Sequence, residues 1–154
     1  MDKAIFIKVF DEIFKSNGFK KKDNNWFADG TELKKLVNLQ KSSFGNYYYL
    51  NYGFLINRLD PDGLWAHFYC RLTSTDKEES QRIDDLLNLD SGIEEEQRIS
   101  EIQFHLVMDV IIRLQKINTE SELLFEIKKL PHLNTVPLIV KKHFNLLPAD
   151  LAKP

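Results

Sequence analysis

The stretch LVNLQKSSFGNYYYLNYGFLI, residues 36–56, decides the fold, because two alternating segments in it are joined by the turn Ser-Ser-Phe-Gly-Asn at residues 42–46. Side chains alternate between the two faces of a β-strand. In residues 47–57 the even positions form the more apolar set, which predicts that they face the core. That set is Tyr48, Leu50, Tyr52, Phe54 and Ile56. The stretch therefore predicts a hairpin with one buried face.

The same alternation assigns faces to two further segments. In residues 64–72 the even positions are again apolar, whereas in residues 36–42 the polarity reverses, so that Val37 and Leu39 are predicted to face the core. If the three strands are neighbours, their faces that point away from the core lie together on one side of the sheet. The predicted side consists of Asn38, Gln40, Ser42, Tyr47, Tyr49, Asn51, Trp65, His67, Tyr69 and Arg71.

This aromatic and hydrogen-bonding set has three interpretations. It resembles protein recognition surfaces, in which Tyr, Trp and Arg dominate the binding energy. It also suits an aromatic platform on which bases stack. A helix folded over it would make it a second packing face, because Tyr and Trp tolerate half-buried positions.

The remaining chain predicts one α+β domain spanning residues 1–154. Apolar residues at helical spacing predict a first helix over residues 2–16, ended by Asn17-Gly18. Four mostly antiparallel strands are expected at about 20–28, 33–42, 47–57 and 64–73. Three to four helices should follow and pack on the sheet, including 93–117, about 119–129 and 136–147. We expect the broad apolar set around residues 104–112 to be covered on two sides.

Composition narrows the class of protein without naming a function. The chain has a net charge of −2, with +3 in residues 1–75 and −5 in residues 76–154, which neither requires nor excludes a nucleic-acid partner. Cys70 is the single cysteine, and no signal-peptide or membrane-spanning pattern is present. We therefore expect a soluble protein in a reducing cytoplasm, with no membrane partner.

No nucleotide-binding, metalloprotease or serine-nucleophile motif is present, and we expect no cofactor and no metal. His105 and Asp109 lie four residues apart on a predicted helix and could supply two metal ligands, but no third ligand is evident from the sequence. Lys20, Lys21 and Lys22 could contact phosphate, although lysines on an edge strand also prevent sheet-to-sheet aggregation.

Several segments together resemble a known family. NGFKKK, the pair Trp26-Phe27, LVNLQKSSF, YYYLNYGFLI and HFYCRL occur in the order seen in a bacterial family of domains of unknown function, the 4304 type. The most specific pieces are VNLQKS at residues 37–42 and NYG at residues 51–53. The resemblance covers about residues 5–75 and carries over no catalytic residue. The occurrence of some members beside polymorphic-toxin loci implies an immunity role.

These observations favour a non-catalytic module that binds another protein through the polar and aromatic sheet face. The alternatives are single-stranded nucleic-acid binding and an enzyme with an unfamiliar site near His67, Tyr69 and Arg71. The apolar band of residues 93–117 is also compatible with the interface of a homodimer.

Overall fold

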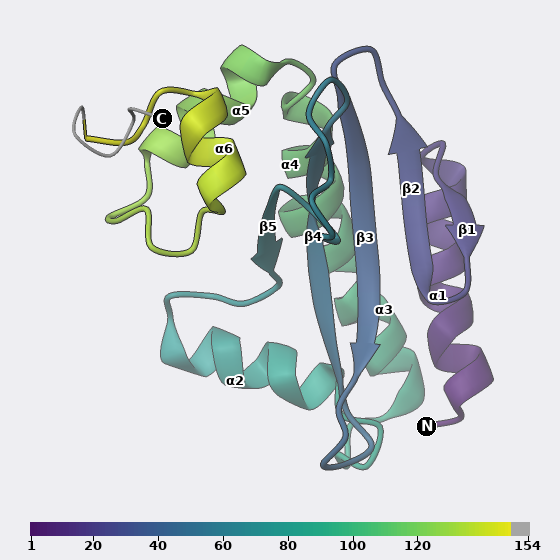
Figure 1. Cartoon of the computed structure of the whole chain (residues 1–154). Coiled ribbons are helices and arrows are strands. Elements are labelled where there is room, and N and C mark those ends of the chain that lie inside the picture. Colours follow the sequence, from purple (N-terminus) through teal and green to yellow (C-terminus); the bar gives the residue numbers. More distant parts are fainter. Residues whose placement is uncertain (149–154) are drawn as a thin grey trace.

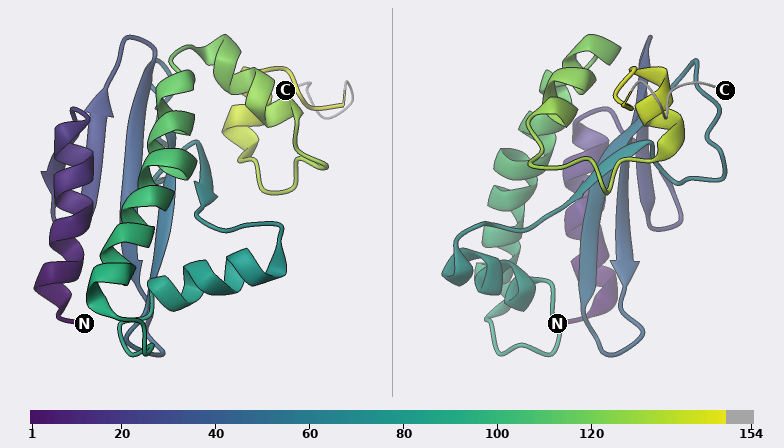
Figure 2. Two further views of the ribbon diagram at one scale, coloured as in Figure 1. Left: turned by 180° about the vertical axis from the view of Figure 1, so that it is seen from behind. Right: turned by 60° about the vertical axis from the view of Figure 1, so that its left-hand side comes forward.

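A computed structural model of the chain describes residues 1–148 and shows a five-stranded antiparallel sheet, with the long helices on one face and α5 and α6 beyond the edge formed by β5 (Figure 1). The strands follow one another across the sheet in the order β1-β2-β3-β4-β5. Seen from behind, α1 and the long helical segment that contains α3 and α4 lie over the sheet (Figure 2). The α+β class and the antiparallel pairing predicted from the sequence are confirmed.

Among the described residues 1–148, the strands all lie in the first half of the chain, and the second half contains only helices. The first half contains α1 Lys3–Ser16, β1 Lys20–Lys22, β2 Asn25–Asp29, β3 Leu33–Lys41, β4 Tyr48–Ile56 and β5 Phe68–Arg71. The second half contains α2 Lys77–Leu86, α3 Glu95–His105, η1 Leu106–Ile111, α4 Ile112–Lys116, α5 Glu120–Lys128 and α6 Leu138–His143.

The sheet has five strands, not the predicted four. Residues 20–28 do not form one strand, because Asp23 has a φ of 56° and the chain reverses there to pair Lys22 with Asn25. The last predicted strand, 64–73, is also too long, since only Phe68–Arg71 pairs as a strand with β4. Residues 64–67 lie in the connection between the two strands.

Helix α1 is anchored by one aromatic stripe. Asp2 caps its first turn by accepting from the N–H groups of Ala4 and Ile5, and Gly18 follows its end with a φ of 87°. Phe10 and Phe14 pack against the indole of Trp26 on β2, with ring centroids 6.2 and 5.1 Å apart. Each fully buried aromatic side chain contributes roughly 1.5–3 kcal/mol, so this contact fixes α1 on the sheet.

The predicted helix 93–117 is one continuous helical segment with a π-helical centre. The π-helical stretch η1 joins α3 to α4, and such stretches are uncommon and frequent at functional sites. The prediction that its centre is covered on two sides is wrong, because Phe104 and Met108 are exposed. None of the helices within residues 1–148 has the length and apolar character needed to cross a bilayer.

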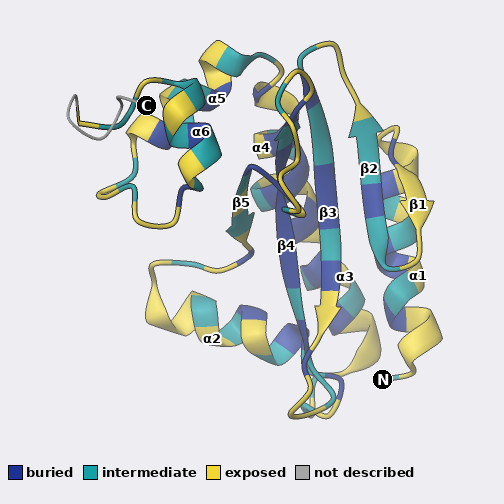
Figure 3. Ribbon diagram, viewed as in Figure 1, coloured by how far each residue is buried: buried dark blue, intermediate teal, exposed yellow. Residues whose placement is uncertain are grey.

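Figure 3 shows β4 buried along most of its length. Its core face follows strand parity, but Leu36 on β3 and Asn51 and Gly53 on β4 are also buried, although they belong to the opposite face. The core face of β4 is formed by residues that are at most 3% exposed, namely Tyr48, Leu50, Tyr52, Phe54 and Ile56. On β3, Val37 and Leu39 are buried beside them, as the alternation predicts. Helix α1 and the α3–α4 segment therefore take one face of the sheet, and the opposite face carries the polar set together with Leu36 and Gly53.

Candidate functional site: an open polar face of the sheet

The face of the sheet opposite α1 and the α3–α4 segment is free of helices in the described part of the chain, and the connection between β4 and β5 crosses in front of its upper part (Figure 1). Figure 1 looks onto this face, and within residues 1–148 no helix lies over β1 to β4 from this side. Its side chains come from the even positions of β3 and the odd positions of β4, which the register places opposite one another. Within residues 1–148, this face is therefore not a second packing face beneath a helix.

One row of polar side chains crosses this face. The register pairs Asn25 with Asn38, Asn38 with Asn51 and Asn51 with Arg71, so four residues from four strands lie in line across the sheet. Three of the four are asparagines. We call Asn25, Asn38, Asn51 and Arg71 the polar row.

Hydrogen bonds join the polar row from end to end. Asn38 Nδ2 donates to Asn25 Oδ1 at 2.7 Å, and Asn51 Nδ2 donates to Asn38 Oδ1 at 3.4 Å. Arg71 Nε donates to Asn51 Oδ1 at 3.1 Å. Gln40 Oε1 accepts a further bond from Asn51 Nδ2 at 3.1 Å. Such a network holds each side chain in one orientation, which lowers the entropy that binding would otherwise cost.

Arg71 ends the polar row as a fixed positive charge. Its guanidinium lies over the ring of Tyr49, with Cζ 4.1 Å from the ring centroid, which is within cation–π distance. Arg58 and Arg82 pair with Glu120 and Glu101, but Arg71 has no carboxylate within ion-pair distance among the described residues. The side chain is thus positioned by neutral groups while its charge remains available to another molecule.

Two aromatic pairs lie beside Arg71. The rings of Trp65 and Tyr69 meet edge to face with centroids 5.7 Å apart, and those of Tyr47 and Tyr49 at 5.6 Å. Tyr69 is 57% exposed and Trp65 is 37% exposed. Phe44, at the tip of the β3–β4 hairpin, is 91% exposed. Exposed aromatic side chains next to an arginine are typical of protein recognition surfaces.

Three of the ten predicted side chains are buried. His67 is fully buried: Nδ1 accepts from the N–H of Ile56 at 2.8 Å, and Nε2 lies 2.8 Å from the carbonyl oxygen of Asp60. Because an N–H only donates and a carbonyl only accepts, the ring is a neutral tautomer with its proton on Nε2. Asn51 and Ser42 are 6% and 7% exposed; Asn51 bonds within the polar row, and Ser42 Oγ accepts from the N–H of Phe44 in the hairpin turn.

The structure therefore separates His67 from Tyr69 and Arg71. A catalytic site formed by these three side chains requires the imidazole to reach the open face, and both of its nitrogens are used inside the protein. His67 has a structural role, which is to close the connection between β4 and β5. Whether the other nine predicted residues bind a partner stays a prediction.

Sequence reasoning missed two members of the open surface, Asn25 and Phe44. Asn25 follows the turn residues Asp23 and Asn24, and a third polar residue there is easily assigned to the turn. A signal was present, since Asn25 lies two residues before Phe27 in an alternating segment. Phe44 lies inside a predicted turn, where a large apolar residue is itself unusual.

A cleft of about 160 Å³ lies on the other side of β4 and β5, next to α4 and α5. Its lining includes Tyr52, Cys70, Arg113 and Glu126, and Arg113 Nη1 donates to Tyr52 Oη at 2.8 Å. Burial raises the pKa of Tyr52 to about 12 and raises the pKa of the Cys70 thiol above its usual value. Both groups are thus protonated at neutral pH, so Cys70 lacks the thiolate that a nucleophilic role requires.

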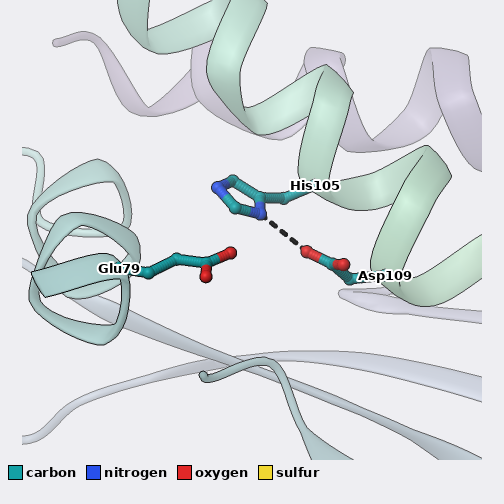
Figure 4. Close-up of side chains that lie close together, drawn as sticks. All are labelled: Glu79, His105 and Asp109. Carbon is teal, nitrogen blue, oxygen red and sulfur yellow. Dashed lines mark hydrogen bonds and ion pairs between the residues drawn. The ribbon is translucent and has the colours of Figure 1, made fainter. Parts of the chain in front are cut away.

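Three potential metal ligands meet on the helical side of the sheet (Figure 4). His105 Nδ1 lies 2.7 Å from Asp109 Oδ2, and Glu79 from α2 points toward the same space. One ligand atom from each of the three lies within 4.8 Å of the others. The pair predicted from the sequence therefore has a third neighbour, 26 residues earlier in the chain.

Residues 10–116 match a family described as Domain of unknown function (DUF4304). The chain belongs to this family. The resemblance predicted from the sequence is thus confirmed, and it extends beyond residue 75 into α3, η1 and α4. Comparison with curated proteins and with solved structures gave no match. The polar row and the three potential metal ligands all lie within the DUF4304 region, whereas α5 and α6 follow it.

Proposed function

We propose that this DUF4304 protein is a non-catalytic recognition module that binds another protein through the open sheet face. The observation that carries the proposal is Arg71: an exposed guanidinium held in place by Asn51 and Tyr49, without an acidic partner among residues 1–148. The proposed partner places a carboxylate against Arg71 and an apolar group against Tyr69 and Trp65.

The energetics favour recognition at this position. Arginine and aromatic side chains near the centre of an interface often contribute 2 kcal/mol or more to binding, which is about 30-fold in affinity. The cost of ordering them on binding is small here, because Tyr49, Asn51 and Gln40 already fix the guanidinium. A toxin encoded next to this gene would be one such partner, and an immunity role is one form of the proposal.

Single-stranded nucleic acid is the second candidate. Register places Lys20 and Lys22 of β1 on the same face as Phe27 and the polar row, and both lysines are exposed. Cations beside exposed rings suit a strand whose phosphates and bases are contacted together. The lysines also lie on an edge strand, where they prevent sheet-to-sheet association, so this observation is the less specific of the two.

Affinity capture with matched variants tests the proposal. Neighbouring gene products are each tested against the wild type, Arg71→Ala, Tyr69→Ala and the control Phe125→Ala. The control removes an exposed ring from α5, away from the open face. We expect one gene product to bind the wild type and the control with equal affinity, and Arg71→Ala to weaken binding by about 30-fold. Binding that is unchanged in both open-face variants refutes the proposed surface.

A salt titration separates the two candidates. Fluorescence anisotropy with a labelled single-stranded oligonucleotide is measured at 50 and 200 mM salt. Binding to phosphates weakens steeply with salt, because counterions are released from the strand. Micromolar oligonucleotide binding that falls steeply with salt and is lost in Arg71→Ala would replace the protein partner with a nucleic acid.

A further inference from the structure

We propose that Glu79, His105 and Asp109 bind a divalent transition-metal ion, with Zn²⁺ and Co²⁺ as suitable probes. This site is separate from the proposed recognition surface, because it lies among the helices on the other side of the sheet. One imidazole and two carboxylates are ligands that zinc sites use.

The three ligands come from elements that are held rigidly. His105 ends α3 and Asp109 lies in the π-helical stretch η1, while Glu79 is in the first turn of α2. His105 is 8% exposed, and it lines a small apolar space together with Ile83 and Leu106. The imidazole is therefore fixed by packing, and the adjustment on binding falls to the Glu79 and Asp109 side chains.

The distances suit an ion after a small adjustment. Ligand atoms about 2.1 Å from a tetrahedral ion lie roughly 3.4 Å from one another. The 2.7 Å separation of His105 Nδ1 and Asp109 Oδ2 must open by less than 1 Å, and Glu79 must close from within 4.8 Å. Ser74 Oγ donates to Glu79 Oε2 at 3.0 Å and orients the carboxylate that approaches. Three protein ligands leave the fourth position of a tetrahedral ion unfilled. Because Glu79 is exposed, water can reach that position.

Local charge also favours a cation. Glu79 and Asp109 contribute two negative charges beside a buried imidazole, whereas the nearby Glu101 is already neutralised by Arg82 at 2.7 Å. A divalent ion would compensate both free carboxylates together. The imidazole favours Zn²⁺, Co²⁺ or Fe²⁺ over Mg²⁺ and Ca²⁺, which prefer oxygen ligands alone.

A hydrogen bond donated by His105 Nδ1 to the Asp109 carboxylate would produce the 2.7 Å distance without any metal. The two explanations differ in one measurable way, because only a metal site gives saturable binding of one ion per chain. The test uses the full chain after treatment with a chelator. Zn²⁺ is titrated by calorimetry, and Co²⁺ is titrated by visible absorption, which reports the ligand geometry directly.

Two isosteric variants and one control make the test specific. Glu79→Gln and Asp109→Asn each keep the shape of the side chain but remove a charged ligand. Glu78→Gln removes the neighbouring exposed carboxylate, which is not in the cluster. We expect a stoichiometry of one, an affinity that falls by more than tenfold in each ligand variant, and no change in Glu78→Gln. A loss of tenfold or more is reasonable, because removing even a residue that supports a ligand typically costs 10–100-fold.

Thermal unfolding provides a second measurement. Since the ion would tie α2 to α3 and η1, the Tm of the wild type should rise with the logarithm of Zn²⁺ concentration above the Kd, and that of Glu79→Gln should not. The proposal is overturned if Zn²⁺ shows no saturable binding at concentrations up to about 100 μM. It is also overturned if both ligand variants bind Zn²⁺ as tightly as the wild type does. Arg71→Ala should bind Zn²⁺ like the wild type, so failure of the recognition surface and failure of the metal site are distinguishable.

Discussion

Replacing Gly53 by alanine should displace β5, and with it the part of the open face that carries Arg71. Gly53 lies on β4 directly opposite Tyr69. A Cβ at this position would lie 2.1 Å from the carbonyl oxygen of Phe68 and 2.6 Å from Cα of Tyr69, whereas real Cβ contacts under 3.0 Å essentially never occur. The neighbour is main chain, so it cannot rotate away.

The geometry gives the size of the effect. Relieving the overlap requires about 0.9 Å of separation between β4 and β5. The bonds His67 N–Phe54 O and Leu72 N–Leu50 O are each 2.8 Å long, and the same displacement lengthens them to about 3.7 Å, beyond hydrogen-bonding range. Loss of two to three main-chain hydrogen bonds at about 1 kcal/mol each predicts a destabilisation of roughly 2–3 kcal/mol.

Urea unfolding followed by circular dichroism measures this effect, and hydrogen exchange localises it. With an m-value of about 2 kcal/mol/M, the midpoint should fall by roughly 1–1.5 M. The amides of His67 and Leu72 should exchange faster than in the wild type. Gly92→Ala is the matched control, since a Cβ there meets no atom within 4 Å. An unchanged midpoint, with both amides still protected, would refute the close-approach explanation of Gly53.

Three further predictions concern buried or bridging polar side chains. Arg98→Met should lower the free energy of unfolding in urea by roughly 3–5 kcal/mol, because it removes a fully buried guanidinium. That guanidinium donates to main-chain carbonyls including those of Asp85, Leu86, Asn88 and Ser91. A loss under about 1 kcal/mol would contradict this. His67→Phe should cost roughly 2–4 kcal/mol in the same assay, since it leaves the Ile56 N–H and the Asp60 carbonyl without partners; the exposed His132→Phe should change stability by less than about 0.5 kcal/mol. Glu120→Gln should lower the Tm by more at pH 7 than at pH 3, because Arg58, and then His143, hold the pKa of the Glu120 carboxyl below its usual value. A group of this kind stabilises the folded state above its unfolded pKa of about 4.3, and the contribution is lost as the pH falls through the folded pKa. A Tm difference that is the same at both pH values would exclude this ion pair as the cause.

The faces of β3 and β4 could be predicted because each depends on local alternation. Apolar residues at every second position assign a strand to the core whatever its neighbours are, and Leu50 and Val37 lie where that rule places them. The rule failed at His67 for a physical reason. It was extended over residues 64–67, which are not in a strand, and alternation does not reveal that His67 is buried with its imidazole bonded to Ile56 and to Asp60 in the connection.

The three potential metal ligands show what local sequence patterns do not predict. His105 and Asp109 share a helical face because they are four residues apart, and the sequence alone indicates this. Glu79 joins them only through the packing of α2 beside α3 and η1. Nothing in the sequence around Glu79 distinguishes it from its exposed neighbour Glu78.

The sequence by itself determined the α+β class, the core face of each long strand and the family, because periodicity and short motifs are local properties of the chain. Only the tertiary structure decided that Asn25, Asn38, Asn51 and Arg71 form one row, and that Glu79 meets His105 and Asp109. The reason is that strand register and helix packing are set by the whole core at once. They bring together residues whose separation along the chain carries no signal of their contact.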